Sequence, residues 1–276
     1  MTKPYKIFVM LFTFLAYAFS GIIIAYILIQ GIPNISPGLF EWQYTSKNVS
    51  IMPALVTTLF TIILTLLITL PMGIFTAVYL SNYAKNKRFI KAVRFSTEIL
   101  SSIPSIVYGL FGYLFFVSGV NMGLGMGYSL IAGCLTIAIM ILPTIIRTTE
   151  EAINTVNPLQ AHASLALGAT KIQTIFKVVI PEAMDGILGG IFLATGRIVG
   201  ESAALIYTMG TQPSIPTSLK NSGRTLAIHM YMLSSEGFHV KEAYATAVLL
   251  LIFVIVINWI SGRICLLYTS PSPRDS

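Results

Sequence analysis

Six long apolar runs constrain the fold of this chain more than any other feature. Each run reaches the roughly 20 apolar residues that a helix needs to cross the hydrocarbon core of a bilayer. Their bounds are Ile7–Ile29, Ile51–Leu80, Ile99–Val120, Tyr128–Ile146, Gly186–Met209 and Tyr244–Ile264. A helix satisfies all its backbone hydrogen bonds internally, as lipid requires. The pattern therefore predicts an all-α membrane protein with six transmembrane helices.

The amino-acid composition limits the classes of protein to which this chain can belong. Only 10% of the residues are charged, against about 25% in a soluble domain, so most of the surface is expected to face lipid. Cys134 and Cys265 lie in or beside apolar runs, and neither has a partner at metal-ligand spacing, so no disulfide framework, metal centre or cofactor is expected. The sequence has no GxxxxGK[ST] motif and therefore no nucleotide site of its own. We expect a transport subunit and not an enzyme.

Basic residues are distributed unevenly between the two sets of loops. Twelve Lys and Arg residues lie on the side that carries both termini, and four lie on the other side. By the positive-inside rule, this asymmetry predicts a multi-pass protein with both termini in the cytoplasm. It also explains the net charge of +7 without nucleic acid as a partner. The first run resembles a cleavable signal at Ala16–Ala18, but it continues to Ile29, which favours an uncleaved span.

The chain divides into three parts on this interpretation. Residues 1–50 hold the first transmembrane helix and an external loop, and residues 51–264 form a core of five helices. Residues 265–276, CLLYTSPSPRDS, continue neither an apolar nor an amphipathic pattern. We interpret them as a non-native tail.

A polar insert, residues 147–185, interrupts the core on the cytoplasmic side. Pro158 is well placed to start a short helix, and Gly168 suits its C-terminal cap, because a side chain there would need an unfavourable positive φ. A second helical stretch is predicted from Lys171 to Val179, ending at Pro181. An insert of this shape offers a docking surface for a partner.

Two further patterns have a structural and a functional interpretation. Pro71 and Pro104 each remove a backbone donor inside an apolar run, which predicts kinks relieved by packing or a bend that opens a central pathway. The GLGMG sequence, residues 123–127, faintly resembles a phosphate-binding loop, but it opens no βαβ unit and is better interpreted as a flexible external turn.

The fifth run contains the polar residues of greatest interest. Arg197 and Glu201 are four residues apart, so in a continuous helix they project from one face. Ionised groups at bilayer depth cost about 2.5–3.5 kcal/mol on insertion scales, so they are expected to pair or to face water. They are interpreted either as a structural ion pair or as the lining of a pathway for a charged solute. Small residues every fourth position allow close helix packing; they are Gly186, Gly190 and Ala194, then Gly196, Gly200 and Ala204.

The insert resembles the EAA loop of bacterial ABC-importer permeases, E-A-A-x3-G-x9-I-x-L-P. The matching positions here are His162, Ala163, Ser164, Gly168, Val178, Ile180 and Pro181. His162 stands where that family has Glu, and Ser164 where it has Ala. The segments IPSIVYGLFG, LPTIIRTTEEAI, LALGATKIQTI and RIVGESAAL are similar to those of PstA-type permeases of phosphate-specific importers. The resemblance covers roughly residues 50 to 262.

This resemblance implies an importer in the bacterial cytoplasmic membrane. Its other members would be a second, homologous permease, a cytoplasmic ATPase dimer and an external phosphate-binding protein. His162, Ala163, Ser164, Gly168 and Pro181 would belong to the coupling segment that docks on the ATPase, and Arg197 and Glu201 to the translocation pathway. The outer loop 211–241, with Arg224, His229 and His239, would help to receive the binding protein.

Two alternatives remain open from the sequence. A permease for another oxyanion, such as sulfate or molybdate, would share the same pattern. Glu201 favours phosphate among these ions, because phosphate keeps a proton that it can donate in a hydrogen bond to a carboxylate. A secondary transporter driven by an ion gradient would usually have inverted repeats, and none is evident. A membrane-embedded enzyme has no support from metal ligands or a catalytic triad.

Overall fold

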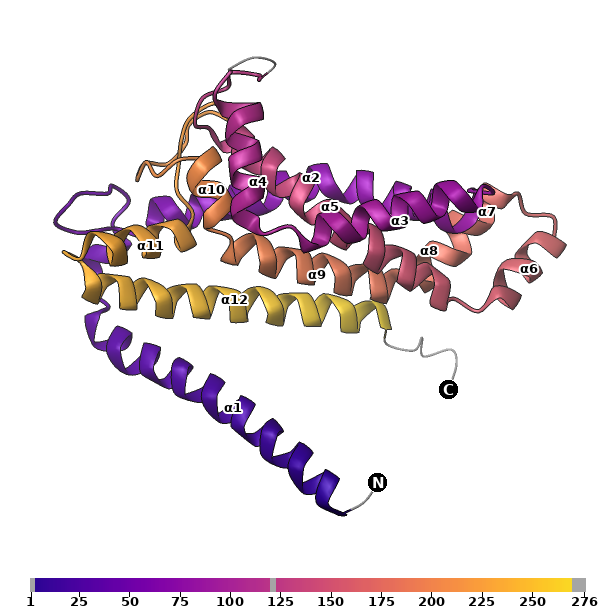
Figure 1. The fold of residues 1–276 in the computed structure, drawn as a ribbon, viewed down its shortest axis with the longest axis horizontal. Coiled ribbons are helices and arrows are strands. Elements are labelled where there is room, and N and C mark those ends of the chain that lie inside the picture. The colour runs from indigo at the N-terminus through magenta and orange to yellow at the C-terminus, as the bar shows by residue number, and fades with distance from the viewer. Residues whose placement is uncertain (1–2, 120–122, 270–276) are drawn as a thin grey trace.

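The computed structural model describes residues 3–119 and 123–269, and every regular element in these ranges is helical (Figure 1). In chain order the elements are α1 (Lys3–Gly31), η1 (Ile32–Asn34), η2 (Pro37–Phe40), α2 (Met52–Asn82), α3 (Lys87–Ser102), α4 (Ser105–Gly112), η3 (Tyr113–Val117), α5 (Leu130–Thr155), α6 (Pro158–Ala166), α7 (Lys171–Thr174), η4 (Ile175–Val179), α8 (Ile180–Glu182), α9 (Met184–Gly200), α10 (Ala203–Thr208), α11 (Leu226–Glu236) and α12 (Val240–Thr269). The all-α prediction is confirmed.

The long helices form a bundle around α5. Helices α2, α5, α9 and α12 run along a common direction (Figure 1). Ile137, Met140 and Ile141 of α5 are fully buried and pack with Ala194 and Ile198 of α9. The apolar window of α5 is 67% buried, more than that of any other single candidate span among the described residues, so α5 lies at the centre of the bundle.

The described residues contain four single helices that are long and apolar enough to span a membrane, and two bent helix pairs that raise the number to as many as six. The single helices correspond to the first, second, fourth and sixth predicted runs. The pairs, 87–117 and 171–200, contain the third run and most of the fifth. Six apolar segments are therefore present, but two of them are not straight helices.

The third predicted run, Ile99–Val120, was wrong as a single helix. Helix α3 ends at Ser102, α4 begins at Ser105, and the chain bends by 99° between them. Ile103 is extended (φ −69°, ψ 131°), because the ring of Pro104 disfavours helical geometry in the residue before it. The structure therefore has a sharp bend at Pro104, which both interpretations of this proline include. Helix α2, in contrast, runs through Pro71 without a break.

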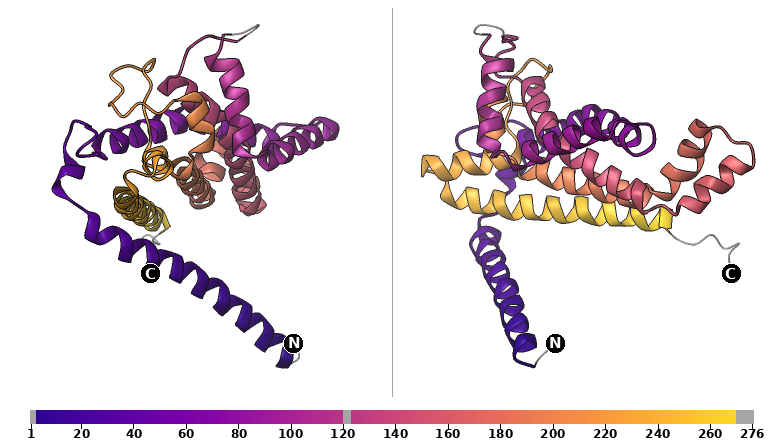
Figure 2. Two further views of the ribbon diagram at one scale, coloured as in Figure 1. Left: turned by 60° about the vertical axis from the view of Figure 1, so that its left-hand side comes forward. Right: turned by 45° about the vertical axis from the view of Figure 1, so that its right-hand side comes forward.

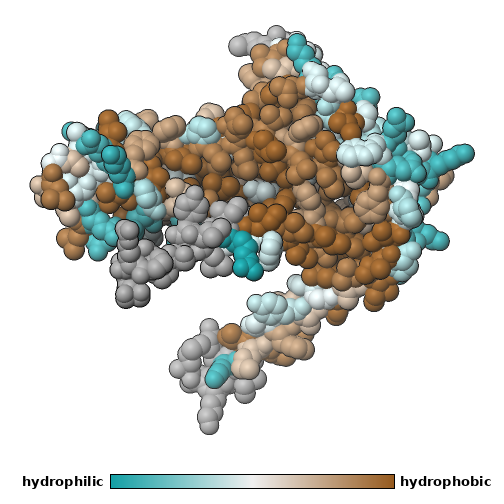
Figure 3. Space-filling model, turned by 180° about the vertical axis from the view of Figure 1, so that it is seen from behind, coloured by the Kyte–Doolittle hydropathy of each residue, from teal (hydrophilic) through white to brown (hydrophobic). Residues whose placement is uncertain are grey.

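The face of the bundle seen in Figure 3 is broadly apolar, with polar residues gathered towards its ends. Helix α1 diverges from the bundle and meets α12 only near its C-terminal end (Figures 1 and 2). There, Gly31 approaches the backbone of Tyr244, and the hydroxyls of Tyr26 and Tyr244 lie 3.4 Å apart. Lipid is a suitable environment for these exposed apolar side chains.

The two ends of the bundle differ. Helix α6 lies at one end and α11 at the other, and the start of α1 and the end of α12 both point towards the α6 end (Figure 1). Helix α12 continues to Thr269, so the predicted change of structure after 264 does not coincide with the end of the helix. Residues 270–276 of the proposed tail lie outside the described residues.

The GLGMG turn folds back on the preceding helix. The amides of Leu124, Met126 and Gly127 donate to the carbonyls of Phe115, Phe116 and Val117. Those amides are therefore used within the chain and do not form a phosphate cradle.

Candidate functional site

The fifth apolar run breaks at its polar residues. Helix α9 ends at Gly200, and Glu201 is extended (φ −77°, ψ 125°). The prediction that Arg197 and Glu201 share one helix face was therefore wrong, because the helical spacing stops between them. No ion pair joins the two side chains in the described part of the chain.

Glu201 stabilises the start of the next helix. Its Oε1 accepts a hydrogen bond from the backbone N–H of Ala204 at 3.0 Å, and the residue is only 8% exposed. A carboxylate at a helix N-terminus satisfies a free N–H group and interacts favourably with the helix dipole. The remaining oxygen, Oε2, accepts no hydrogen bond from any described residue.

Arg197 lies in the last turn of α9 and is half-buried. Its charge acts on the hydroxyl of Tyr108, which in turn donates to the carbonyl of Leu100 at 2.7 Å. Tyr108 belongs to α4 and Leu100 to α3, so this hydrogen bond spans the 99° bend. Arg197 therefore lies within electrostatic range of the bend in the third run.

The two broken segments pack against each other. A Cβ atom on Gly109 of α4 would lie 2.9 Å from the Cα of Ala204 in α10, so the helices meet backbone to backbone. Irregular backbone at membrane depth is tolerated where it is buried in protein or lines a watery cavity, and discontinuous helices commonly form ion and substrate sites. Arg197 and Glu201 lie where such a site is expected.

The small residues of α9 have two different environments. The Gly186 row packs within this chain, because Cβ atoms on Gly186 and Gly190 would lie 2.6 Å and 2.7 Å from side-chain atoms of Ala152 and Thr148 in α5. At Gly196 and Gly200, a Cβ would meet nothing within 4 Å. The close helix approach predicted for the first row is confirmed with α5. In the second row, Gly196 and Gly200 are open, whereas Ala204 packs against Gly109.

The insert has the predicted helix–glycine–helix shape. Asn157 caps α6 by accepting from the N–H of Leu159 at 3.0 Å, and Gly168 has φ +89°. Leu167 is 89% exposed, and His162 and Ala163 are also exposed. An exposed apolar side chain beside polar ones suits a protein contact.

One contact holds the two parts of the insert together, and another fixes it on the bundle. The hydroxyls of Ser164 and Thr174 lie 3.0 Å apart, joining α6 to α7. The Nζ of Lys171 donates to the carbonyl of Asn82 and lies 4.6 Å from the ring centre of Tyr83, at the end of α2. Sequence reasoning missed the Lys171 contact, since no local pattern relates residues so far apart.

The second helical stretch was predicted to end at Pro181, but it continues past this residue. The chain stays helical through the π-helical segment η4 and through α8. Proline is tolerated in the first turn of a helix, where its missing N–H needs no partner. The next turn of the chain comes at Ala183, and the bend between the two parts of this segment is 65°.

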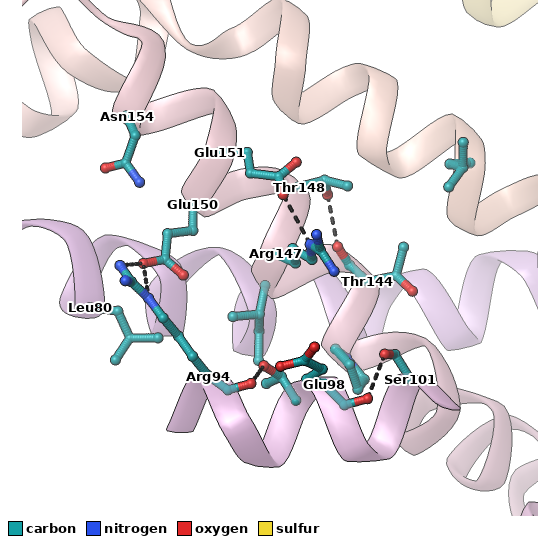
Figure 4. Close-up of a pocket in the computed structure, with 14 residues that line it drawn as sticks. Leu80, Arg94, Glu98, Ser101, Thr144, Arg147, Thr148, Glu150, Glu151 and Asn154 are labelled. Carbon is teal, nitrogen blue, oxygen red and sulfur yellow. Dashed lines mark hydrogen bonds and ion pairs between the residues drawn. The ribbon is translucent and has the colours of Figure 1, made fainter. Parts of the chain in front are cut away.

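A charged cavity of ≈ 560 Å³ lies between α3, α5 and α9 (Figure 4). Arg94 of α3 donates from Nε and Nη2 to Oε1 of Glu150, and Arg147 donates to Glu151 at 2.9 Å. Glu98 also lines it. The sequence predicted none of these pairs, because the α3–α5 contact depends on the bend at Pro104.

Two residues expected in the external docking loop are buried instead. Arg224 is 5% exposed and His229 is fully buried, so neither side chain offers a surface to a binding protein. His239 is less enclosed, with its Nδ1 3.7 Å from Oε2 of Glu242. The resemblance implied that the outer loop with Arg224, His229 and His239 would help to receive the binding protein, and the burial of Arg224 and His229 contradicts this role for those two residues.

Residues 69–265 match the model of the family described as binding-protein-dependent transport system inner membrane component. The chain belongs to this family. Its members are membrane subunits of transport systems, which agrees with the expectation that the chain is not an enzyme.

Several relatives of this family member carry names that refer to transport. The chain is 37% identical over 198 residues to the probable ABC transporter permease protein YqgI of Bacillus subtilis, covering 66% of each chain. It is 34% identical to the phosphate transport system permease protein PstA homolog of Mycoplasma genitalium, covering 91% of this chain and 39% of that one. It is 30% identical to the PstA protein of Haemophilus influenzae, covering 84% and 82%. The chain thus spans less than two thirds of the first two relatives.

Solved structures of importers share the fold of this family member. The inward-facing MetNI methionine ABC transporter aligns with a TM-score of 0.61 at 24% identity, covering 80% of this chain and 94% of that chain. The bacterial alginate ABC transporter, in complex with an alginate pentasaccharide-bound periplasmic protein, aligns with a TM-score of 0.67 at 18% identity, covering 95% and 96%. At these identities the likeness shows the fold of an ABC-importer permease and no more.

Proposed function

We propose that this chain is a permease subunit of an ATP-driven importer that moves inorganic phosphate across the bacterial cytoplasmic membrane. The observation that carries the proposal is the position of Arg197 and Glu201 where the broken third and fifth segments pack together. A guanidinium there can compensate the charge of a passing oxyanion. The names of the PstA relatives favour phosphate as that oxyanion.

Glu201 gives a physical reason to prefer phosphate over sulfate or molybdate. Phosphate retains a proton near neutral pH and can donate a hydrogen bond to the free Oε2 of Glu201, whereas sulfate has no proton to donate and would be repelled. Arg197 and Glu201 need not form an ion pair for these roles, since each reaches the pathway from its own side of the break. No observation favours a secondary transporter.

The partners follow from the family and from the exposed insert. We infer a second, homologous permease on the open Gly196–Gly200 side of α9, where another helix can approach closely. A cytoplasmic ATPase dimer would take the insert, with His162, Ala163 and the exposed Leu167 in contact. Ser164, Gly168 and Pro181 would shape the coupling segment, and a phosphate-binding protein would dock at the α11 end.

The orientation follows from charge. With twelve basic residues on the α6 side and four on the other, the α6 end and both termini belong in the cytoplasm. In this arrangement residues 51–264 form the permease core, residues 1–50 add the first helix and an external loop, and residues 265–276 are not needed for transport.

Reconstitution tests the proposal. The chain is co-purified with the second permease and the ATPase, placed in vesicles with the binding protein, and supplied with ATP and radiolabelled phosphate, sulfate or molybdate. ATP-dependent uptake of phosphate, in preference to the other oxyanions, is expected. Uptake of sulfate or molybdate without phosphate would establish the rival oxyanion permease, and uptake without any ATPase partner would establish a secondary transporter.

A further inference from the structure

A second buried cation lies at the end of the bundle opposite α6. Arg224 directly precedes Thr225, the N-cap of α11, and is only 5% exposed. No carboxylate forms an ion pair with it among residues 3–119 and 123–269. An uncompensated buried charge is costly, so this guanidinium calls for an anionic partner.

The carboxylates at this end of the bundle have other surroundings. Glu41 accepts a hydrogen bond from Nδ2 of Asn48 at 2.6 Å, and Glu242 lies beside His239. Glu236 is exposed at the end of α11. The charge of Arg224 is thus not balanced from within the described chain.

One edge of the guanidinium is free. The Nε and Nη2 atoms of Arg224 are both buried and donate to no described residue. Its flat face lies 4.5 Å from the ring centre of Tyr44. In Arg94 the same two nitrogens both donate to Glu150, which shows how this edge is used when an anion is present. Two parallel N–H groups match two oxygens of an oxyanion.

His229 adds polar groups without adding charge. Its ring packs edge-on against Tyr44 at 6.1 Å between ring centres, and neither ring nitrogen has a hydrogen bond of good geometry to a described residue. Burial, and then the charge of Arg224, lower the pKa of His229 to about 3, and a contact with the Val49 backbone opposes this only in part. The neutral ring has one N–H donor and one acceptor nitrogen.

A cavity adjoins this cluster at Tyr44. A cavity of ≈ 440 Å³ is lined by Trp42 and Tyr44 on one side and by residues 212–215 on the other. Tyr44 therefore separates an open cavity from the Arg224 guanidinium.

We propose that Arg224 forms an external phosphate-binding subsite, in which Nε and Nη2 hold two phosphate oxygens and His229 hydrogen-bonds a third. This inference rests on the proposed function and adds a first binding position before the anion reaches Arg197. Hydrogen phosphate fits because its oxygens can accept from the guanidinium while its P–OH can donate to the imidazole. A small ion suits the site, since Arg224 is enclosed beneath Tyr44.

The experiment uses the purified complex of permeases and ATPase, without binding protein or ATP, so that binding is measured apart from transport. This chain has two tryptophans, Trp42 and Trp259. A Trp259→Phe background, with the tryptophans of the partner subunits also replaced, leaves Trp42 as a fluorescent reporter beside the site. Inorganic phosphate is titrated and fluorescence and equilibrium binding of radiolabelled phosphate are recorded together.

Arg224→Gln should remove the Trp42 response and weaken phosphate binding at this subsite about tenfold or more, because a bidentate charged contact is lost. Arg224→Lys keeps the charge but lacks the two parallel N–H groups, and it should also bind phosphate more weakly. Lys220→Gln removes a charge from the same loop at an exposed position and should bind as the parent does. Melting temperatures confirm that each variant is folded.

An unchanged phosphate titration in folded Arg224→Gln and Arg224→Lys would overturn the subsite. A parent complex without a Trp42 response to phosphate would also overturn it. Loss of binding-protein docking in Arg224→Gln, with phosphate binding intact, would instead assign the two free N–H groups of Arg224 to a carboxylate of the binding protein. The proposed function is tested separately by measuring uptake. If the parent importer carries phosphate and Arg224→Gln binds phosphate normally, only the subsite is refuted.

Discussion

Arg94 and Glu150 join α3 to α5 through one carboxylate oxygen, with Nε of Arg94 3.0 Å from Oε1 of Glu150 (Figure 4). The Arg94 side chain is 56% exposed and that of Glu150 is 10% exposed. This difference matters because the cost of breaking a pair depends on which charge is left buried. The pair also secures α3 on the near side of the bend at Pro104.

Arg94→Gln should therefore destabilise the protein more than Glu150→Gln does. The first change leaves the enclosed carboxylate of Glu150 without its cation, at a cost of about 1–3 kcal/mol in the free energy of unfolding. The second leaves an arginine that can reach water. Unfolding in detergent measures both, with Arg147→Gln as the control, since its pair with Glu151 is exposed on both sides and should contribute little. Equal losses for Arg94→Gln and Glu150→Gln would contradict this account.

Gly168 is predicted to be essential for coupling and dispensable for membrane insertion. Its φ of +89° is unfavourable for any residue with a Cβ, although no atom lies within 4 Å of the place where a Cβ would be. Gly168→Val should strain the turn after α6, weaken ATPase docking and abolish uptake. Pull-down of the ATPase and vesicle uptake measure these effects.

Gly262→Val is the matched control for the Gly168 test, since that glycine also has open space around it but lacks a positive φ. Normal uptake by Gly168→Val, at normal expression, would remove the insert from the transmission of ATPase movement.

The buried His229 predicts a pH dependence of stability. Its pKa in the folded protein is about 3, below the ordinary value of 6.5. Between these values the unfolded chain binds a proton that the folded chain does not, so stability should fall as pH decreases below about 6.5. Melting temperatures from pH 8 to pH 5 should decline in the parent and decline less in His229→Gln. His162→Gln, at an exposed position, serves as the control, and an identical slope in parent and His229→Gln would refute the assignment.

Hydropathy was sufficient to locate the six apolar segments, because length and apolar content decide which segments cross lipid. It could not locate the breaks at Pro104 and Glu201, because hydropathy is averaged over a window of about 19 residues, which is longer than the interruption. The turn at Gly168 was predictable because only glycine adopts positive φ at no cost. The burial of Arg224 was not predictable, because it depends on packing against Tyr44, which lies 180 residues earlier in the chain.

The charges of Arg197 and Glu201 within an apolar run identified them as candidate pathway residues, but the sequence did not predict how the two residues lie relative to each other. Four-residue spacing predicted that Arg197 and Glu201 share one helix face, as an ion pair or as a pathway lining. In the structure α9 ends between them, and Glu201 accepts a hydrogen bond from the N–H of Ala204 instead. The ion-pair interpretation predicts that Arg197→Gln with Glu201→Gln together should restore transport. The broken helix predicts no such rescue, because neither charge compensates the other directly.

Phosphate uptake by vesicles containing the complete importer, with the Arg197 and Glu201 variants compared in parallel, tests the pathway most directly. Glu201→Gln keeps an amide oxygen for the Ala204 N–H, so it removes the charge and preserves the cap. Assembly and ATP hydrolysis should persist in Arg197→Gln, in Glu201→Gln and in the double variant, while phosphate uptake is lost in Arg197→Gln and in the double variant and impaired in Glu201→Gln. Lys6→Gln, far from the break, should transport normally. A double variant that assembles and takes up phosphate at the parent rate would contradict a pathway through Arg197.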